Sequence, residues 1–374
     1  MTVALVSNFL NHHQIPFCEE MLKKCDNFYF IATDNGATQG YQVTCKKSYV
    51  VDYETEKERA EQILLDADAV IFGSCPNSLI KLRMDENKLS FFYSERFFKK
   101  GTWRRFIPST RKVLNERIGQ FKDKNMFVFC ASAYLPYDLS LIGFPSEKCL
   151  KWGYFPDCQL YADQEEKMPN SIIWSARMLD WKHPEIPVLV AEKLKKDGYS
   201  FNLTIVGDGV ELENTKNLAK EKNVTDCVSF LGSLPHDELL SQMRKHEIFL
   251  MTSDFYEGWG AVLNEAMSSR CVPVASHAIG SVPFLIKDNE NGLIFHSGNA
   301  NDAYLKVKKL FDNREMIKEM SKNAYSVMKE SYNYKIASDR LAEFLNNMIQ
   351  KDSMVTYEEG PLSKAAVITN NWYR

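Results

Sequence analysis

The 374-residue sequence lacks the cysteine patterns that mark disulfide scaffolds and structural zinc sites. Its nine cysteines, an odd number, are scattered and include no Cys-x-x-Cys pair, so neither kind of module is predicted. No apolar run approaches the roughly 20 residues that a membrane-spanning helix needs. The first residues carry no basic stretch and turn polar after Val6, which favours a first β-strand over a signal peptide. We therefore expect a cytoplasmic chain, dissolved or peripheral at the inner face of the membrane.

A large charge imbalance is missing as well. The formal net charge is -3 and the sequence pI is about 6.2, which excludes a globally basic nucleic-acid-binding protein. Hydrophobic residues make up 45% of the chain and charged residues 25%, as in ordinary globular proteins. Since single hydrophobic cores stop growing at about 250 to 300 residues, two domains are expected.

Short apolar runs alternate with helical patterns along the chain, and this alternation predicts parallel sheets of the α/β class. A polar stretch at 156–170 separates two such series. We predict two doubly wound, Rossmann-like domains, residues 1–160 and 161–340, and a C-terminal helix and tail, 341–374, that pack back on the first domain. Strands are predicted near residues 3–7, 28–32, 69–73, 90–93, 126–131, 150–154, 171–176, 202–206, 227–230, 248–251, 271–275 and 292–295.

The densest chemical signal is a pair of carboxylates, Glu257 and Glu265, separated by seven residues. Gly258 and Gly260 follow the first carboxylate and predict a tight loop whose backbone can approach a ligand. The next residues suit a helix, whose first N–H groups can bind phosphate while carboxylates accept hydrogen bonds from hydroxyls. A nucleotide sugar fits this layout. The alternative is that Glu265 is a solvated helix residue and Glu257 a capping acid.

Two further features follow predicted strands of the second domain. Arg177 and Lys182 come after the strand at 171–176 and could clamp a diphosphate, although surface charge is the alternative. Gly207-Asp208-Gly209 follows the next strand and indicates either a close approach to a ligand or a tight turn. These groups belong to the same edge of a parallel sheet as the Glu257 loop. Their coincidence favours a site that lies in a cleft between the two domains.

Together with the strands at 271–275 and 291–295, these motifs resemble the retaining, GT-B-fold glycosyltransferases of family four over about residues 171–295. The resemblance implies that Arg177 and Lys182 hold the donor diphosphate. It further implies that Glu265 binds ribose and that Glu257 faces the transferred sugar. The amides of Gly258, Trp259 and Gly260 would contact the sugar or the distal phosphate. No metal or cofactor is implied; the nucleotide sugar is a substrate.

The first domain departs from that family's pattern. His12 and His13 follow the first predicted strand, where neutral or charged histidine can contact acceptor hydroxyls or diphosphate oxygens. A helix cap is the alternative role for either one. Glu95 follows the strand at 90–93 and is a further cleft candidate. Asp66-Ala67-Asp68 has the form of a metal-binding acidic pair, but it precedes a strand, and we interpret it as a turn.

Residues 96–124 hold ten Lys or Arg against two acids. Phe97, Phe98, Trp103 and Phe106 lie among the first of these cations. Basic residues mixed with aromatics suit an anionic membrane surface, and a solvated helix face is the alternative. No RNA-binding module accompanies them. The membrane interpretation predicts a lipid-linked acceptor, as in surface-polysaccharide biosynthesis.

The leading hypothesis is therefore a metal-independent, retaining glycosyltransferase that moves a sugar from a nucleotide diphosphate to a saccharide or lipid-linked hydroxyl acceptor. Two alternatives share the same phosphate-binding residues. One is another GT-B enzyme, such as a nucleotide-sugar epimerase or a phosphorylase. The other is a catalytically silent nucleotide-sugar binder, which would be marked by loss of Arg177, Lys182, Glu257 or Glu265. All four residues are present.

Overall fold

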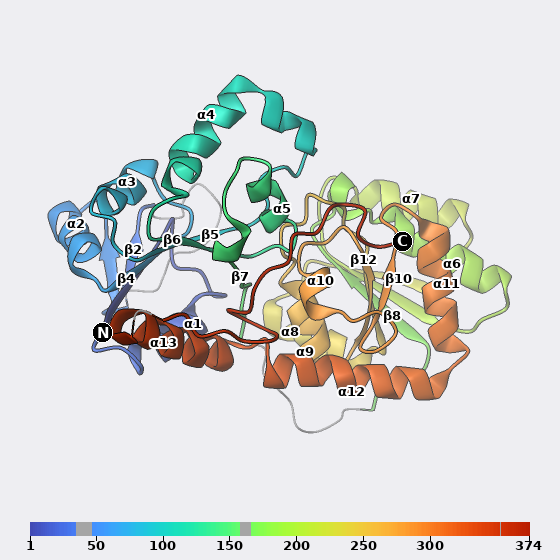
Figure 1. The fold of residues 1–374 in the computed structure, drawn as a ribbon. Helices are drawn as coiled ribbons and strands as arrows, with labels where there is room; N and C mark the ends of the chain where they lie inside the picture. Colours follow the sequence, from blue (N-terminus) through green and yellow to red (C-terminus); the bar gives the residue numbers. More distant parts are fainter. Residues whose placement is uncertain (35–46, 158–165, 352) are drawn as a thin grey trace. The chain divides into compact units, whose positions relative to one another are not determined.

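The structure, a computed structural model, describes residues 1–34, 47–157, 166–351 and 353–374. It divides into two compact units, shown with the chain coloured from end to end in Figure 1. Unit 1 consists of Met1–Asp157 and Ser331–Thr369, and unit 2 consists of Cys158–Glu330 and Asn370–Arg374. Part of the predicted linker, 158–165, lies outside the described residues.

Unit 1 is built on a seven-stranded sheet whose strands pair in parallel in the order β3-β2-β1-β4-β5-β6-β7. The central strands β1 and β4 are nearly continuous apolar runs, and they are buried because helices cover both faces of such a sheet. The strands are β1 Thr2–Ser7, β2 Asn27–Ala32, β3 Val50–Asp52, β4 Ala69–Phe72, β5 Ser90–Ser94, β6 Met126–Cys130 and β7 Cys149–Lys151.

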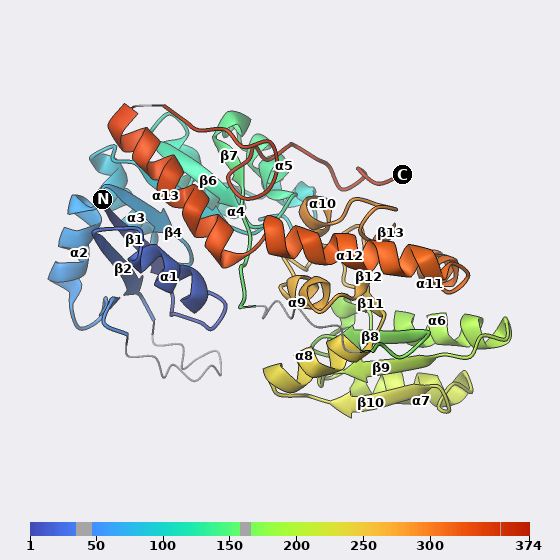
Figure 2. The same cartoon turned by 90° about the horizontal axis from the view of Figure 1, so that it is seen from below.

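Helices α1 to α5 connect these strands, and the long C-terminal helix α13 returns to the same unit. In Figure 2, α13 runs beside α1, against which it packs. Lys24 and Asp339 form an ion pair that joins α13 to the chain after α1. The helices are α1 Ile15–Leu22, α2 Lys57–Asp66, α3 Asn77–Asp85, α4 Pro108–Arg117, α5 Leu135–Ser140 and α13 Tyr334–Lys351, with short 3-10 turns η2 Thr102–Phe106, η3 Gly119–Phe121 and η4 Ser146–Lys148.

This packing moves the division between the units from the predicted residue 340 to residue 330. The reason is that α13 packs against α1 and that Phe344 of α13 contacts Phe91 of β5, so the whole helix belongs to unit 1. The last five residues also differ from the prediction, because Asn370–Arg374 belong to unit 2. There the hydroxyl of Tyr373 donates a hydrogen bond to the carbonyl of Ile294, at 2.6 Å.

Unit 2 has a six-stranded sheet in which all strand pairs are parallel, in the order β10-β9-β8-β11-β12-β13. Figure 2 shows this order from β10 at the bottom to β13 at the top. The strands are β8 Ser171–Ser175, β9 Asn202–Val206, β10 Val228–Gly232, β11 Ile248–Met251, β12 Val272–Ser276 and β13 Leu293–Phe295. The helices are α6 Glu185–Lys196, α7 Leu212–Glu221, α8 His236–Lys245, α9 Val262–Ser268, α10 Val282–Leu285, α11 Ala300–Phe311 and α12 Arg314–Glu330, with the 3-10 turn η5 Asp180–Lys182.

Both sheets have one topological switch point, where the chain changes the direction in which it adds strands. In unit 1 it lies between β1 and β4, and in unit 2 between β8 and β11. Ligands of open parallel sheets bind outside the carboxyl ends of the strands at such a point. The loops that follow these four strands are therefore where a site is expected in each unit.

Three smaller features bear on the sequence predictions. The carboxylate of Asp68 accepts a hydrogen bond from the amide of Thr2 at 2.7 Å, so Asp66-Ala67-Asp68 forms the predicted turn between α2 and β4. Among the described residues, no group of three His, Cys, Asp or Glu side chains could hold a metal ion. No helix in the described part of the chain is long and apolar enough to cross a membrane.

Candidate functional site

A buried ion pair lies at the switch point of unit 2. Lys182 ends the turn η5 after β8, and Glu257 lies in the loop after β11. The ammonium of Lys182 donates a hydrogen bond to Oε2 of Glu257, which also accepts one from the hydroxyl of Ser253 at 3.1 Å. Lys182 is 9% exposed and Glu257 is 8% exposed. The two groups expected to meet different parts of a donor therefore contact each other directly.

Backbone hydrogen bonds between the two loops hold this pair in place. The amide of Asp254 donates to the carbonyl of Trp181 at 3.0 Å, and the hydroxyl of Thr252 donates to the carbonyl of Lys182 at 2.6 Å. Thr252 in turn accepts the indole N–H of Trp174, at 2.8 Å. The ammonium of Lys182 also lies 4.2 Å from the ring centroid of Trp181, a cation–π contact. The position of the lysine is thus fixed by strands β8 and β11 together.

Two ionisable groups beside the pair have shifted pKa values. A hydrogen bond with Glu185 raises the pKa of His183. Burial raises the pKa of Asp254. His183 has a left-handed backbone, with φ of 52°, and it ends the turn that carries Lys182.

The glycine loop after Glu257 is constrained by its own packing. Gly260 has φ of 84°, and a Cβ there would lie 2.4 Å from Cε of Met251 and 3.2 Å from Cγ of Glu257. A larger residue would therefore displace the carboxylate. Among the described residues, the amides of Gly258 and Gly260 make no hydrogen bond. The side chain of Trp259 is fully buried and donates to Asn264 at 2.9 Å, so this side chain does not face a ligand.

Glu265 lies in α9, one turn beyond that loop, and is 5% exposed. A ring nitrogen of His236, Nε2, lies 3.2 Å from its carboxylate oxygen Oε1. Sequence reasoning missed His236. It is the first residue of α8 and follows the strand β10, so the strand-end argument that singled out the other candidates would have found it.

The other strand-end candidates of unit 2 differ in their surroundings. Arg177 is exposed, and its side chain has no hydrogen-bond or ion-pair partner in the described part of the chain, although its carbonyl accepts from the amide of Leu179. A Cβ on Gly207 would lie 1.9 Å from the carbonyl oxygen of Ala176, and one on Gly209 would lie 2.5 Å from that of Met178. Asp208 is exposed and its carboxylate accepts from the amide of Gly209. Both glycines are thus explained by the close approach of the loop after β8 to their backbone.

In unit 1, a cavity of about 460 Å³ opens at the switch point. Its walls come from the loops after β1, β4 and β5, as the topology predicts. His12, His13 and Glu95, the three first-domain candidates, all line it. The rings of the two histidines lie 3.8 Å apart between centroids. The structure therefore brings together residues that are more than 80 positions apart in the chain.

Glu95 is the best-defined polar group in this cavity. It accepts hydrogen bonds from the ammonium of Lys99 at 2.6 Å and from the hydroxyl of Tyr154 at 3.2 Å. Burial, the largest cause, and the charge of Glu95 raise the pKa values of Tyr93 and Tyr154 well above the usual range. The two tyrosines therefore remain neutral hydroxyls, which donate to the carbonyl of Gly153 and to Glu95, and their oxygens can accept hydrogen bonds.

The basic segment 96–124 is less uniform than its sequence indicates. Arg96 is buried, forms an ion pair with Asp138 at 3.2 Å and lies over the ring of Tyr134. Arg117 donates to the carbonyls of Gly73 and Cys75. Exposed aromatic side chains of the segment lie in η2, where Trp103 is 59% and Phe106 is 69% exposed. Cations lie close to them in η2 and at the start of α4. We call Trp103, Arg104, Arg105, Phe106 and Arg111 the basic-aromatic patch.

Chemically, the unit 2 site combines a cation from the turn after β8 with two carboxylates and free backbone donors of the loop and helix after β11. The ammonium of Lys182, a compact point charge with several donors, can bind a phosphate oxygen in place of Glu257. The carboxylates of Glu257 and Glu265 are acceptors for hydroxyl groups. Such a set recognises a ligand that is anionic in one part and polyhydroxylated in others.

Comparison with known proteins finds similarity in this part of the chain. Residues 161–327 match the family model described as glycosyl transferases group 1. An alpha-D-kanosaminyltransferase of Streptomyces kanamyceticus is 27% identical over 46% of this chain and 44% of its own length. The amylovoran biosynthesis glycosyltransferase AmsK of Erwinia amylovora is 25% identical over 64% of this chain and 61% of its own length. The chain thus spans about half the length of the curated relatives that it matches.

Among solved structures, Anabaena HepE in complex with UDP is similar, with a TM-score of 0.70 and 13% sequence identity over 93% of this chain and 100% of that chain. At this level of identity the likeness shows the fold alone. The prediction of a GT-B architecture with two doubly wound α/β units is confirmed.

Proposed function

Because residues 161–327 form a domain of the glycosyl transferases group 1 family, we propose that this chain moves a sugar, with retention, from a nucleotide diphosphate to a hydroxyl acceptor. The observation that carries the proposal is the buried contact of Lys182 with Glu257 at the switch point of unit 2, beside Glu265. UDP bound in the similar Anabaena structure supports a nucleotide diphosphate as the donor.

In this proposal the bound donor replaces the contact between Lys182 and Glu257. Lys182 transfers its hydrogen bond from Glu257 to the diphosphate, and Arg177 closes on the same phosphates from the exposed end of β8. The amides of Gly258, Trp259 and Gly260 face the distal phosphate and the sugar. Glu265, positioned by His236, accepts from the ribose hydroxyls, and the released Glu257 accepts from the sugar. Each group belongs to the loops, turns or helix starts that follow β8, β10 and β11.

The chemical step breaks the bond between the anomeric carbon and the phosphate oxygen and forms one to the acceptor oxygen. The acceptor proton passes to the departing phosphate oxygen on the same face of the sugar, which retains the configuration. Lys182, Arg177 and the loop amides stabilise the negative charge that grows on that oxygen, the kind of electrostatic term that is commonly the largest in catalysis. The step requires no metal ion.

We place the acceptor in the unit 1 cavity. Glu95, Tyr93 and Tyr154 offer fixed hydrogen-bonding groups, and His12 and His13 stand at the loop after β1. The basic-aromatic patch in the same unit supports an acceptor that is held at a membrane surface, such as a lipid-linked or surface-polysaccharide precursor. Exposed Trp103 and Phe106 suit the interface, and the neighbouring arginines suit anionic headgroups.

A thermal-shift screen over nucleoside diphosphates and nucleotide sugars tests donor binding and identifies the base. A ligand at a hundred times its dissociation constant stabilises the folded state by about 2.7 kcal/mol. We expect one nucleotide class to raise the melting temperature of the protein but not that of Lys182→Ala. If no nucleotide sugar raises the melting temperature, or if Lys182→Ala responds equally, the donor site is not where we place it.

A further inference from the structure

Unit 2 also contains a cavity, with a volume of about 830 Å³. It lies at the edge of the sheet where the strands begin, opposite the edge that carries Lys182 and Glu257. Its walls are residues that come immediately before β8, β11 and β12, together with one face of α12. In a parallel sheet, residues before the strands lie at the amino end, whereas Lys182 and Glu257 follow their strands. The cavity is therefore separate from the proposed donor site.

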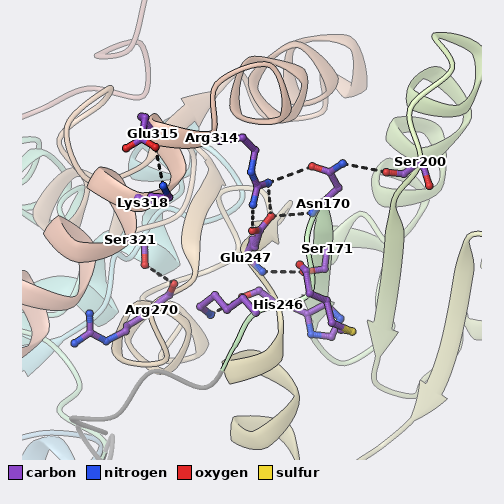
Figure 3. Close-up of polar contacts among 12 residues, drawn as sticks. Asn170, Ser171, Ser200, His246, Glu247, Arg270, Arg314, Glu315, Lys318 and Ser321 are labelled. Carbon is purple, nitrogen blue, oxygen red and sulfur yellow. Dashed lines mark hydrogen bonds and ion pairs between the residues drawn. The ribbon is translucent and has the colours of Figure 1, made fainter.

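Its lining is strongly basic. The described residues around it include seven Lys or Arg side chains and three glutamates. Figure 3 shows how some of these charges are used: Arg314 pairs with Glu247, and Lys318 pairs with Glu315 at 2.7 Å. The ammonium of Lys167 donates to backbone carbonyls, including those of Arg244 and Ser269. These three cations stabilise the fold and are already engaged.

The cations of Arg270 and Lys322 are not neutralised by the residues that the structure describes. Neither forms an ion pair within the described part of the chain. The guanidinium of Arg270 lies 4.0 Å from the ring centroid of Tyr325, which holds it flat without neutralising it. In Figure 3 its side chain lies apart from the Arg314–Glu247 pair, and its backbone carbonyl accepts a hydrogen bond from Ser321. Lys322 is exposed on the face of α12 that also carries Lys318 and Tyr325.

Two buried polar atoms at the base of the cavity also lack partners. The hydroxyl of Ser268 and Nε of Arg270 are shielded from solvent, yet neither makes a hydrogen bond among the described residues. Ser268 is 4% exposed. Buried donors without partners cost folding free energy, and such groups are a signature of a ligand or ion that satisfies them. One donor is a hydroxyl and the other a cation, so the missing partner is an acceptor with negative charge.

We propose that this cavity binds a soluble anion of the phosphate class, a phosphate or diphosphate ester or the inorganic ion. Arg270 and Ser268 donate to its oxygens from the base of the cavity, and Lys322 contributes charge from α12. The planar guanidinium offers the paired donors that match phosphate oxygens. The cavity is larger than inorganic phosphate requires, so an organic group attached to the phosphate has room beside Tyr325.

The occupied cavity would lie one short helix from the donor residues. Ser268 is the last residue of α9, and the amide of Ser269 donates to the carbonyl of Glu265 at 2.9 Å. With about 1.5 Å of rise per residue, the seven residues of α9 span roughly 10 Å. The two sites are thus close but do not share side chains, and variants can separate them.

Isothermal titration calorimetry with inorganic pyrophosphate at constant ionic strength tests the proposal. We expect Lys322→Glu and the Arg270→Gln/Lys322→Glu double variant to weaken binding about tenfold or more, which is a loss of about 1.4 kcal/mol. Lys220→Glu makes the same charge change on α7 outside the cavity, and it should bind as the unmodified protein does. Because Lys322 is exposed, Lys322→Glu remains informative even if the double variant does not fold.

Lys182→Ala distinguishes this site from the proposed donor site, because it should leave pyrophosphate binding at the cavity in place. Equal binding by Lys322→Glu and Lys220→Glu would overturn the proposal. So would loss of all pyrophosphate binding in Lys182→Ala, since the donor site would then be the only anion site. If Lys322→Glu abolished binding to anionic-lipid vesicles but not to pyrophosphate, the ligand would be a lipid headgroup and not the soluble anion proposed here.

Discussion

Lys182 and Glu257 come from loops 75 positions apart in the chain and form an ion pair that is about nine-tenths buried. A buried pair of this kind contributes little net stability, but removing one partner leaves an uncompensated charge inside the protein. The same cost favours anion binding. If Lys182 leaves Glu257, a bound phosphate supplies the negative charge that the buried ammonium then needs. The pair therefore links the stability of unit 2 to its proposed ligand.

The first prediction concerns that stability. Lys182→Met and Glu257→Leu should each lower the free energy of unfolding by about 3 to 5 kcal/mol, because each leaves the other charge buried and unpaired. The double variant should recover a large part of the loss. Urea denaturation of the single and double variants measures this coupling. Additive losses in the double variant would show that the two side chains do not interact.

The second prediction concerns the glycine loop. Gly260→Ala should cost about 1 to 3 kcal/mol of backbone strain and should also displace Glu257, since the new Cβ meets Met251 and Glu257. Gly298→Ala is the matched control: it also has positive φ, of 74°, but its Cβ would meet nothing within 4 Å. We expect similar backbone costs in urea denaturation, with a loss of turnover only in Gly260→Ala. Equal turnover would mean that the position of Glu257 is unimportant.

A pH dependence follows from His183, whose pKa is raised by Glu185. Histidine in an unfolded chain titrates near pH 6.5. Because the folded pKa is higher, this contact stabilises the protein fully below about pH 6.5, and the stabilisation is lost as the pH rises through the folded value. The unfolding free energy of the unmodified protein minus that of Glu185→Gln should therefore fall across this window. A difference that stays constant or rises with pH would contradict the assignment.

The basic-aromatic patch predicts binding to membranes. The protein should sediment with vesicles that contain anionic lipid, less so at high salt, and Trp103→Ser/Phe106→Ser should weaken this binding. Val210→Ser is the control, because Val210 is an exposed apolar residue of unit 2, 77% exposed. Absence of vesicle binding at every salt concentration, or equal binding by both variants, would remove the support for a membrane-held acceptor.

Much of the fold was predictable because buried parallel strands leave long apolar runs in the sequence. The strand at 248–251 matches β11 fully. The three-residue strand β3 was missed, since so short a run carries no periodic signal. The predicted strand at 150–154 is shorter in the structure, at Cys149–Lys151. The residues after Lys151 leave the sheet. The carbonyl of Gly153 instead accepts a hydrogen bond from the hydroxyl of Tyr93.

The site was predictable as a set of strand-end residues but not as a set of contacts. Sequence gives the order of strands along the chain, whereas contact between the loops of β8 and β11 depends on their order in the sheet. For the same reason the pairing of His236 with Glu265 was missed. Arg96 was counted as a surface cation, because its partner Asp138 lies 42 positions away. The sequence alone does not show which charged side chains are buried.

The most direct measurement of the central claim is nucleoside diphosphate release from the nucleotide sugar that binds, with and without a hydroxyl acceptor. We predict release that depends on the acceptor and falls about a hundredfold or more in Lys182→Ala and Glu257→Ala, because the proposed mechanism places both side chains against the reacting part of the donor. Folding of each variant is verified separately. Release unaffected by these substitutions, or conversion of the nucleotide sugar to an epimer without release, would contradict glycosyl transfer at this site.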